Sequence, residues 1–299
     1  MSASREELIG LVDRYLDALA AHDPSRLPLA RNVKFTENCS TLGLGKGLWA
    51  TCSGRGRYRH YVAEPAAGQV GFFGTVEENG APAILALRLK AEGPSTLRHS
   101  SGQTGSGRAV ISEVETLVAR QGNPLFAPEN LTEPLPLFGE IVPPTERSSR
   151  EELVRITDLY FDAIERNDGS IIPVTKECIR LENGVHTANN PQSPRPTGRM
   201  SVADAISTGI YTYIPEIRDR RYPVVDVERG LCWGIVFFEH PGNVRSIELR
   251  GIGRVEMAPF TQRPSSAMIA ELFKIRAGQI QIIEAVLEFL PYGIRSGWD

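Results

Sequence analysis

The chain has 299 residues, and its 33 Lys and Arg residues against 36 Asp and Glu residues give a formal net charge of -3. Hydrophobic residues make up 41% of it and charged residues 23%, which excludes a disordered chain and a broadly basic nucleic-acid-binding protein. Apolar runs stay well short of the roughly 18 residues of a membrane-spanning helix, and the N-terminus lacks a secretory signal pattern. The four cysteines contain no C-x-x-C pair, so we expect free thiols and a cytoplasmic protein without nucleic-acid or membrane partners.

The first predicted element is a helix, and it belongs to an internal repeat. Ser4 and Glu7 have the spacing of a capping box, and the apolar residues that follow recur at helical spacing, with Tyr15 among them. Residues 5–38 recur as residues 150–183 at a constant offset of 145, and 13 of the 34 positions are identical. The second copy repeats the capping box. The repeat and the length predict two tandem domains.

Strands are predicted to follow the helices of each half. Residues 84–90 alternate between two faces, with Arg88 on the face of Ile84, and residues 234–239 are β-branched and aromatic, as in a central strand. Helices first and antiparallel strands afterwards predict an α+β fold. At an offset of 150, Phe238 occupies the position of Arg88, so we expect the charged residues of the two halves to differ.

A proline-rich segment marks the boundary between the copies. Residues 121–148 contain six of the 21 prolines, which predicts an extended linker between a first domain, residues 1–120, and a second, residues 149–299. Residues 99–107, rich in Gly and Ser, and residues 184–200 are predicted to be long loops.

The apolar character of the strands also predicts how the halves are arranged. A sheet with an apolar outer face must cover it, and a tandem copy offers a matching face at high effective concentration. We therefore expect an intrachain pseudo-dimer packed sheet to sheet, and further homo-oligomerisation stays open. Near the C-terminus, Phe289, Tyr292 and Trp298 predict that the tail docks on the first half or on a partner subunit.

The opening pattern Y-x-x-A-x-x-x-x-D, followed by a strand that ends in Glu-Asn, resembles the nuclear-transport-factor-2-like superfamily. That group includes ketosteroid isomerase, scytalone dehydratase and the SnoaL-like polyketide cyclases. The resemblance covers roughly residues 5–119 and 150–290, and the motifs GLGKGLW (43–49), RYRHY (57–61) and PYGIRSGW (291–298) look like a bacterial and fungal SnoaL-like group. It implies two tandem cone-shaped domains, each with helices packed on a curved antiparallel sheet that encloses a cavity.

The resemblance also implies site residues. Tyr15 and Tyr160 match the helix tyrosine that donates a hydrogen bond to the oxyanion in ketosteroid isomerase, although a core role for both stays open. Asn38 and Asn183 fall where that enzyme has its aspartate base, and an amide cannot take a proton at neutral pH. The neighbouring glutamates, Glu37 and Glu182, would replace the base only where a bulge turns them inward, because strand neighbours point to opposite faces.

Further candidates come from residue chemistry. A histidine side chain is a natural proton shuttle, so His60 is the predicted proton carrier, and His186 is its counterpart in the second half. Cationic side chains of the first half form a predicted lining, and Arg88 has Glu115 as an alternative, purely structural partner. The expected substrate-binding residues of the first half are Asn38, Lys46, Trp49, Arg57, Tyr61 and Arg88, and those of the second half are Tyr160, Asn183 and His186.

Several reaction classes are disfavoured by spacing. The sequence lacks a Walker loop, a complete dinucleotide fingerprint, a G-x-S-x-G elbow and an H-E-x-x-H pair, so we expect no cofactor and no metal. The leading hypothesis is a cofactor-independent lyase, dehydratase or isomerase acting on a small, partly apolar, aromatic or polyketide-like molecule. Its catalytic residues would be Tyr15, His60 and Glu37. The alternative is a non-catalytic ligand-binding or assembly protein, and which half is active stays open.

Overall fold

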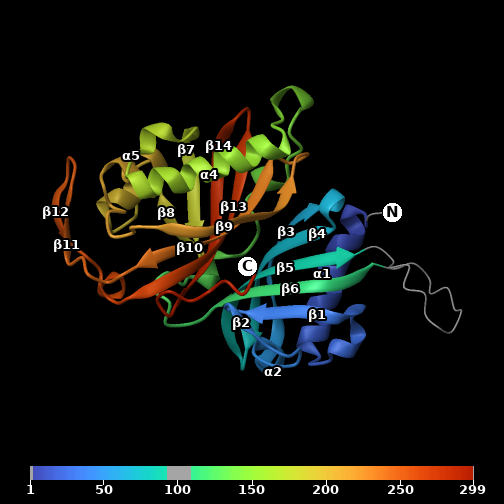
Figure 1. The fold of residues 1–299 in the computed structure, drawn as a ribbon. Helices are drawn as coiled ribbons and strands as arrows, with labels where there is room; N and C mark the ends of the chain where they lie inside the picture. Colours follow the sequence, from blue (N-terminus) through green and yellow to red (C-terminus); the bar gives the residue numbers. More distant parts are fainter. Residues whose placement is uncertain (1–2, 93–108, 299) are drawn as a thin grey trace, which may run out of the picture.

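The computed structural model describes residues 3–92 and 109–298, which form two α+β halves, each built on a six-stranded sheet (Figure 1). The predicted loop at residues 99–107, with His99, lies outside the described residues. The first half contains α1 (Arg5–Ala20), β1 (Leu29–Glu37), β2 (Ser40–Thr41), α2 (Leu48–Thr51), β3 (Cys52–Glu64), β4 (Gln69–Glu78), β5 (Ala81–Glu92) and β6 (Val110–Ala119). Two 3-10 turns, η1 (Pro24–Arg26) and η2 (Pro65–Ala67), complete it.

The second half repeats this order and adds a hairpin. It contains α4 (Arg150–Arg166), η5 (Gly169–Ile171), β7 (Val174–Glu182), β8 (Val185–Ala188), η6 (Pro196–Arg199), α5 (Val202–Ser207), β9 (Ile217–Asp226), β10 (Leu231–His240), β11 (Ser246–Leu249), β12 (Gly253–Glu256), η7 (Pro259–Gln262), β13 (Ser265–Arg276) and β14 (Gln279–Leu290). The hairpin β11–β12 lies between β10 and β13 and projects from the body of the half (Figure 1).

The two sheets have the same strand order, which is β2-β1-β6-β5-β4-β3 in the first half and β8-β7-β14-β13-β10-β9 in the second. Both are mixed rather than antiparallel throughout, because β1 runs parallel to β6 and β7 runs parallel to β14. The shared order makes β13 the counterpart of β5. The prediction that Phe238 replaces Arg88 is therefore wrong, since Phe238 lies on β10 and the inserted hairpin breaks the constant offset. Strand pairing makes Leu272 the counterpart of Arg88.

The caps of the two long helices differ. At α1, the Ser4 side chain accepts from the Glu7 amide and the Glu7 side chain accepts from the Ser4 amide, so the predicted capping box is complete. At α4, Ser149 accepts from the Glu152 amide, but the Glu152 carboxylate pairs with Arg155 instead. Only the serine half of the second box is formed.

Each sheet has two apolar faces. One face packs under the long helix of its own half, with Leu85, Leu87 and Leu89 of β5 beneath α1. The other face meets the opposite half in a shared apolar layer that includes Phe73 and Trp233, whose ring centroids lie 5.4 Å apart. The halves are therefore packed sheet against sheet.

Reciprocal ion pairs border this interface. Arg5, the first residue of α1, binds Asp226 at the end of β9, with a shortest N–O distance of 2.5 Å. Arg150, the first residue of α4, binds Glu64 at the end of β3 at 2.7 Å. Because Arg5 and Arg150 are equivalent in the repeat, each half gives the other the same contact.

The linker and the tail both contribute to packing. Residues between β6 and α4 include η3 (Pro128–Asn130), α3 (Pro136–Gly139) and η4 (Pro144–Glu146). Phe138 of α3 is buried in the shared layer, so the linker is not only an extended surface strap. The tail docks on the first half, as predicted: the indole of Trp298 donates to Thr36 at 2.9 Å and lies under the ammonium group of Lys34.

All four cysteines are buried free thiols. Across residues 3–92 and 109–298, no helix is both long enough and apolar enough to cross a membrane.

Candidate functional site

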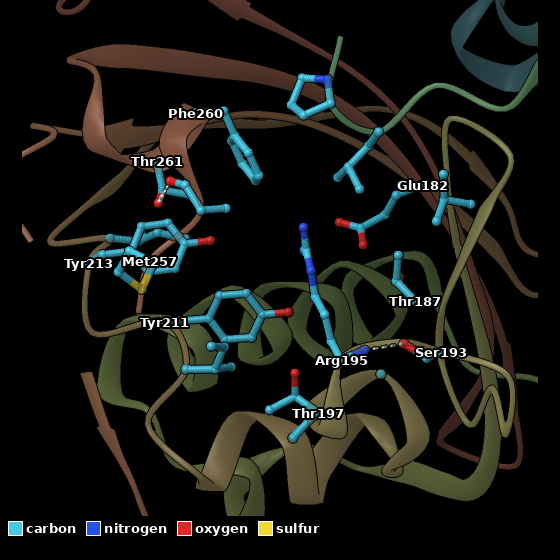
Figure 2. A pocket seen from close by; sticks show the side chains of 18 of the residues that line it. Glu182, Thr187, Ser193, Arg195, Thr197, Tyr211, Tyr213, Met257, Phe260 and Thr261 are labelled. Atoms are coloured by element: carbon cyan, nitrogen blue, oxygen red, sulfur yellow. Dashed lines mark hydrogen bonds between the residues drawn. The ribbon is translucent and has the colours of Figure 1, made fainter. Parts of the chain in front are cut away.

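A cavity of about 470 Å³ lies in the second half, between the helix-covered face of its sheet and the segments that follow β8 and β10 (Figure 2). Its walls include residues 193–198 around η6, residues 210–214, and the base of the hairpin β11–β12 at Leu249 and Val255. The segment 184–200, predicted to be a long loop, contains β8 and η6 instead, and part of it lines the cavity. The volume is in the range of small-molecule sites.

The two repeat tyrosines have different surroundings. In the first half, the hydroxyl of Tyr15 accepts from the indole of Trp49 at 2.9 Å, and the two buried rings pack edge to face. In the second half, the hydroxyl of Tyr160 accepts from the guanidinium of Arg180 at 3.3 Å. An indole thus fills the space beside the first tyrosine, whereas a cation that lines the cavity lies beside the second.

Arg180 is held in place by neighbouring groups. Its Nε donates to the Thr187 hydroxyl at 3.0 Å and lies 3.7 Å from the Glu182 carboxylate, which also lines the cavity. At the repeat offset of 145, the first half has Phe35 at the position of Arg180, in its apolar core. A packed aromatic side chain in one half is therefore replaced by a buried cation in the other.

Glu271 is the second polar replacement. Strand pairing aligns it with Ala285 and, on the far side of Ala285, with Glu182, so the two carboxyl groups share a face of the sheet. Burial raises the pKa of Glu271 to about 8, and the nearby charge of Glu182 adds to the shift. Within the described residues, its Oε2 has no hydrogen-bond partner. The same pairing in the first half places Leu87 at this position.

The loop after β8 supplies a second cation. Figure 2 shows the Arg195 side chain projecting into the cavity between Tyr211, Phe260 and Glu182. The centre of its guanidinium lies 5.9 Å from the Phe260 ring. Burial raises the pKa of Tyr211, so its hydroxyl stays protonated and can donate a hydrogen bond.

Two histidines line the cavity as neutral imidazoles. Burial lowers the pKa of His240 to about 4 and also lowers the pKa of His186. Within the described residues, Nδ1 of His240 and Nε2 of His186 have no hydrogen-bond partner. His186 was predicted as a substrate-binding residue, and the structure places it in the cavity wall.

The three residues predicted to be catalytic lie elsewhere. Tyr15 is a core residue whose hydroxyl is hydrogen-bonded to the indole of Trp49. His60 is on the face of β3 that meets the second half, where its Nδ1 lies 2.8 Å from the carboxylate of Glu284. Glu37 accepts from the backbone amide of Leu48 and pairs with Arg120, as a buried structural carboxylate.

The two repeat asparagines are structural. Asn38 and Asn183 both adopt a φ of 46° just past the end of a strand. The Asn38 side chain donates to the carbonyl of Val118 and accepts from its amide, and Asn183 does the same with Leu287. Each asparagine side chain thus makes the pair of hydrogen bonds that a further strand residue would make through its backbone.

The neighbouring glutamates follow the alternation of their strands. Glu37 lies on the same face of β1 as Phe35, and Glu182 lies on the same face of β7 as Arg180. No bulge is therefore needed to turn Glu182 toward the cavity.

The remaining predicted residues of the first half form no common site. Lys46 and Arg57 are exposed. Tyr61 donates to Asp13 at 2.8 Å, and Arg88 binds Glu115 at 2.8 Å, which is the structural alternative considered for it. Trp49 is buried against Tyr15. Of the predicted second-half residues, Tyr160 does not line the cavity itself, but its hydroxyl is hydrogen-bonded to Arg180, which does.

Four residues of the site region were not among the predicted site residues: Arg180, Glu271, Arg195 and Tyr211. Two of them carry a signal. Arg180 is a charged residue where the repeat has Phe35, and Glu271 is a lone carboxylate in the apolar run 267–273. Arg195 and Tyr211 lie in segments without a counterpart in the first half, so the repeat gives no comparison for them.

The described chain offers no group of three or more His, Cys, Asp or Glu side chains placed to hold a metal ion.

The family match of this chain covers the half that contains the cavity. A family model described as "Domain of unknown function (DUF8021)" matches residues 146–287. No curated protein matches the chain. Among solved structures, it is similar to one titled "Crystal structure of a de novo designed protein with curved beta-sheet", with a TM-score of 0.29 and 10% identity over 47% of this chain and 88% of that chain.

Proposed function

We propose that the second half is a cofactor-independent enzyme that moves a proton on a small, partly apolar molecule, as a lyase, dehydratase or isomerase. The observation that carries the proposal is the exchange of two packed residues of the first half, Phe35 and Leu87, for Arg180 and Glu271 in the second. Arg180 lines the cavity, and Glu271 lies on the same face of the sheet as Glu182 of the cavity wall. Buried charge is costly to a fold, so its presence at a cavity favours chemistry over packing.

The proposal assigns a role to each group at the wall. The carboxylate of Glu182 removes a proton from a carbon next to a carbonyl group. The electron pair of that C–H bond forms the new C=C bond, and the carbonyl π pair moves to oxygen. The hydroxyl of Tyr211 donates to the resulting oxyanion, and Arg180 supplies positive charge beside it. Return of the proton to another carbon completes an isomerisation, and loss of a β-leaving group with its bonding pair completes an elimination.

Glu271 is a positioning group in this scheme. With a pKa of about 8 it is largely protonated at neutral pH, so the proposal gives proton removal to Glu182 rather than to Glu271. This arrangement resembles other sites where neighbouring carboxyl groups differ in protonation and divide the roles of acid and base.

We also propose that each half belongs to the nuclear-transport-factor-2-like fold family and that the protein is cytoplasmic. A long helix over a sheet, with a cavity between them, supports the assignment of each half as a nuclear-transport-factor-2-like cone, with the cone of the first half filled by Trp49. Four buried free thiols support a cytoplasmic location.

The test uses an enolisable bicyclic ketone, 2-tetralone, as a probe. Proton NMR in D2O measures exchange of its α-protons. We expect the full chain to accelerate exchange, Glu182→Gln to lower the enzymatic rate about a hundredfold, and Tyr211→Phe to lower it by a similar factor. Glu177→Gln is the matched control, because Glu177 is an exposed carboxylate on the same strand.

The alternative, a non-catalytic binding protein, is supported by the many apolar residues of the cavity wall, among them Phe238, Phe260 and Phe289. Saturable binding of the probe without accelerated exchange would favour this alternative. Exchange that is equal in the wild type and in Glu182→Gln would rule out the assigned base.

A further inference from the structure

Arg195 is the least neutralised charge of the cavity. It follows Pro194 in the segment between β8 and η6, and its backbone amide donates to the Ser193 hydroxyl at 3.3 Å, which fixes the start of the side chain. The guanidinium projects inward (Figure 2). Within the described residues, it forms neither a salt bridge nor a hydrogen bond, and its centre lies 5.9 Å from the Phe260 ring.

The other charges of the wall have partners. Arg180 lies 3.7 Å from Glu182 and is hydrogen-bonded to Tyr160 and Thr187. At the rim, Glu256 pairs with Arg254 at 3.5 Å, and both are well exposed. Among the described residues that line the cavity, and apart from Glu256 at the rim, two are arginines and one is a glutamate, Glu182. The two cavity histidines are neutral at pH 7, so they do not alter this balance.

We propose that the natural ligand of the cavity carries a carboxylate group, which the Arg195 guanidinium binds, on an aromatic body that packs against Tyr211 and Phe260. The planar guanidinium presents paired N–H donors that match the two oxygens of a carboxylate. Aromatic rings on the same wall offer apolar contact to the rest of the molecule. This inference rests on the proposed function, since it names the class of molecule that enters the same cavity.

The two cavity histidines add no charge to the wall. His240 and His186 line the cavity, and Nδ1 of His240 and Nε2 of His186 are buried atoms without hydrogen-bond partners in the described part of the chain. The His240 ring stacks on Tyr213 at 5.4 Å, which fixes its orientation. A neutral imidazole carries no charge that could attract a carboxylate. The carboxylate preference therefore depends on Arg195 rather than on protonation of a histidine.

The experiment compares two probes of nearly equal shape, naphthalene-2-carboxylate and naphthalene-2-carboxamide, by calorimetric titration of the full chain at pH 7. We expect the carboxylate to bind at least tenfold more tightly than the amide. Arg195→Gln should weaken carboxylate binding about tenfold and leave amide binding within twofold. Arg254→Gln, which removes the same charge at the rim, should change neither by more than twofold. Added salt should reduce the preference of the wild type.

The outcomes separate this inference from the proposed function. Equal binding of the two probes, or a carboxylate preference that persists in Arg195→Gln, overturns the inference while the cavity remains a binding site. A carboxylate preference lost equally in Arg254→Gln also overturns it, because general charge would then explain the preference. Binding of neither probe overturns both proposals. Circular dichroism of each variant verifies that the fold is intact.

Discussion

Glu271 and Leu87 occupy the same position in the two sheets, and one is a buried carboxyl group where the other is a packed aliphatic side chain. The repeat therefore contains its own comparison, because the same fold is built once with an apolar core and once with polar groups next to a cavity.

The stability of the protein should depend on pH through Glu271. Its pKa is about 8 in the folded chain and 4.5 when unperturbed, so the folded state binds more protons between these values. Stability therefore falls as pH rises from about 5 to 8, by an amount on the order of a few kcal/mol. Urea unfolding at several pH values should show this slope in the wild type and a smaller one in Glu271→Gln. Identical slopes would contradict the assignment.

Replacing the buried polar pair with its first-half counterparts should restore stability. Arg180→Phe alone leaves carboxyl groups without their cation and should cost about 3–5 kcal/mol. The double variant Arg180→Phe, Glu271→Leu reproduces Phe35 and Leu87 and should recover most of that loss. Urea unfolding measures both. A double variant no more stable than the single one would show that these groups serve stability rather than function.

The docked tail should stabilise the first half. Trp298→Ala removes the hydrogen bond to Thr36 and the contacts of Lys34 and Arg88 with the indole ring, which together contribute about 1–3 kcal/mol. Tyr292→Ala is the matched control, since Tyr292 is 51% exposed. Thermal unfolding should show a lower Tm for the first variant only. Equal Tm values for the two variants would argue that the docking adds no stability.

Residues 1–120 alone should self-associate. The isolated first half would expose Phe73, Ile84 and the other apolar residues that the second half covers, and Arg5 would lose Asp226. Size-exclusion chromatography with light scattering should report dimers or aggregates. A monodisperse monomer that unfolds cooperatively would be inconsistent with a shared core.

Much of the fold could be predicted because burial leaves a periodic pattern. The apolar face that contains Tyr15, the alternation around Arg88 and the apolar strand at 234–239 all appear in the structure as expected. The parallel pairing of β1 with β6 could not be predicted, because a strand has the same alternation whichever direction its neighbour runs.

The site was harder to predict because sequence motifs do not report what fills a space. His60 and Tyr15 have suitable chemistry, but their roles depend on Glu284 and Trp49, which are distant in sequence and adjacent in the fold. His186 was identified, since it lies close to the repeat. Arg195 could not be identified, because its importance comes from having no acidic partner among residues 3–92 and 109–298, which only three-dimensional neighbours reveal.

The reciprocal contacts of Arg5 and Arg150 resemble those of a symmetric dimer, but here both halves belong to one chain. In a symmetric assembly of two separate identical chains, every substitution is made twice, so a change that opens one cavity opens both. Joining the copies in one polypeptide lets each position vary on its own. The first copy can keep Trp49 and Phe35 in a densely packed core. The second copy can lose part of that packing and contain a cavity with charged residues in its wall. Duplication here separates the demand for stability from the demand for reactivity and assigns each to its own half.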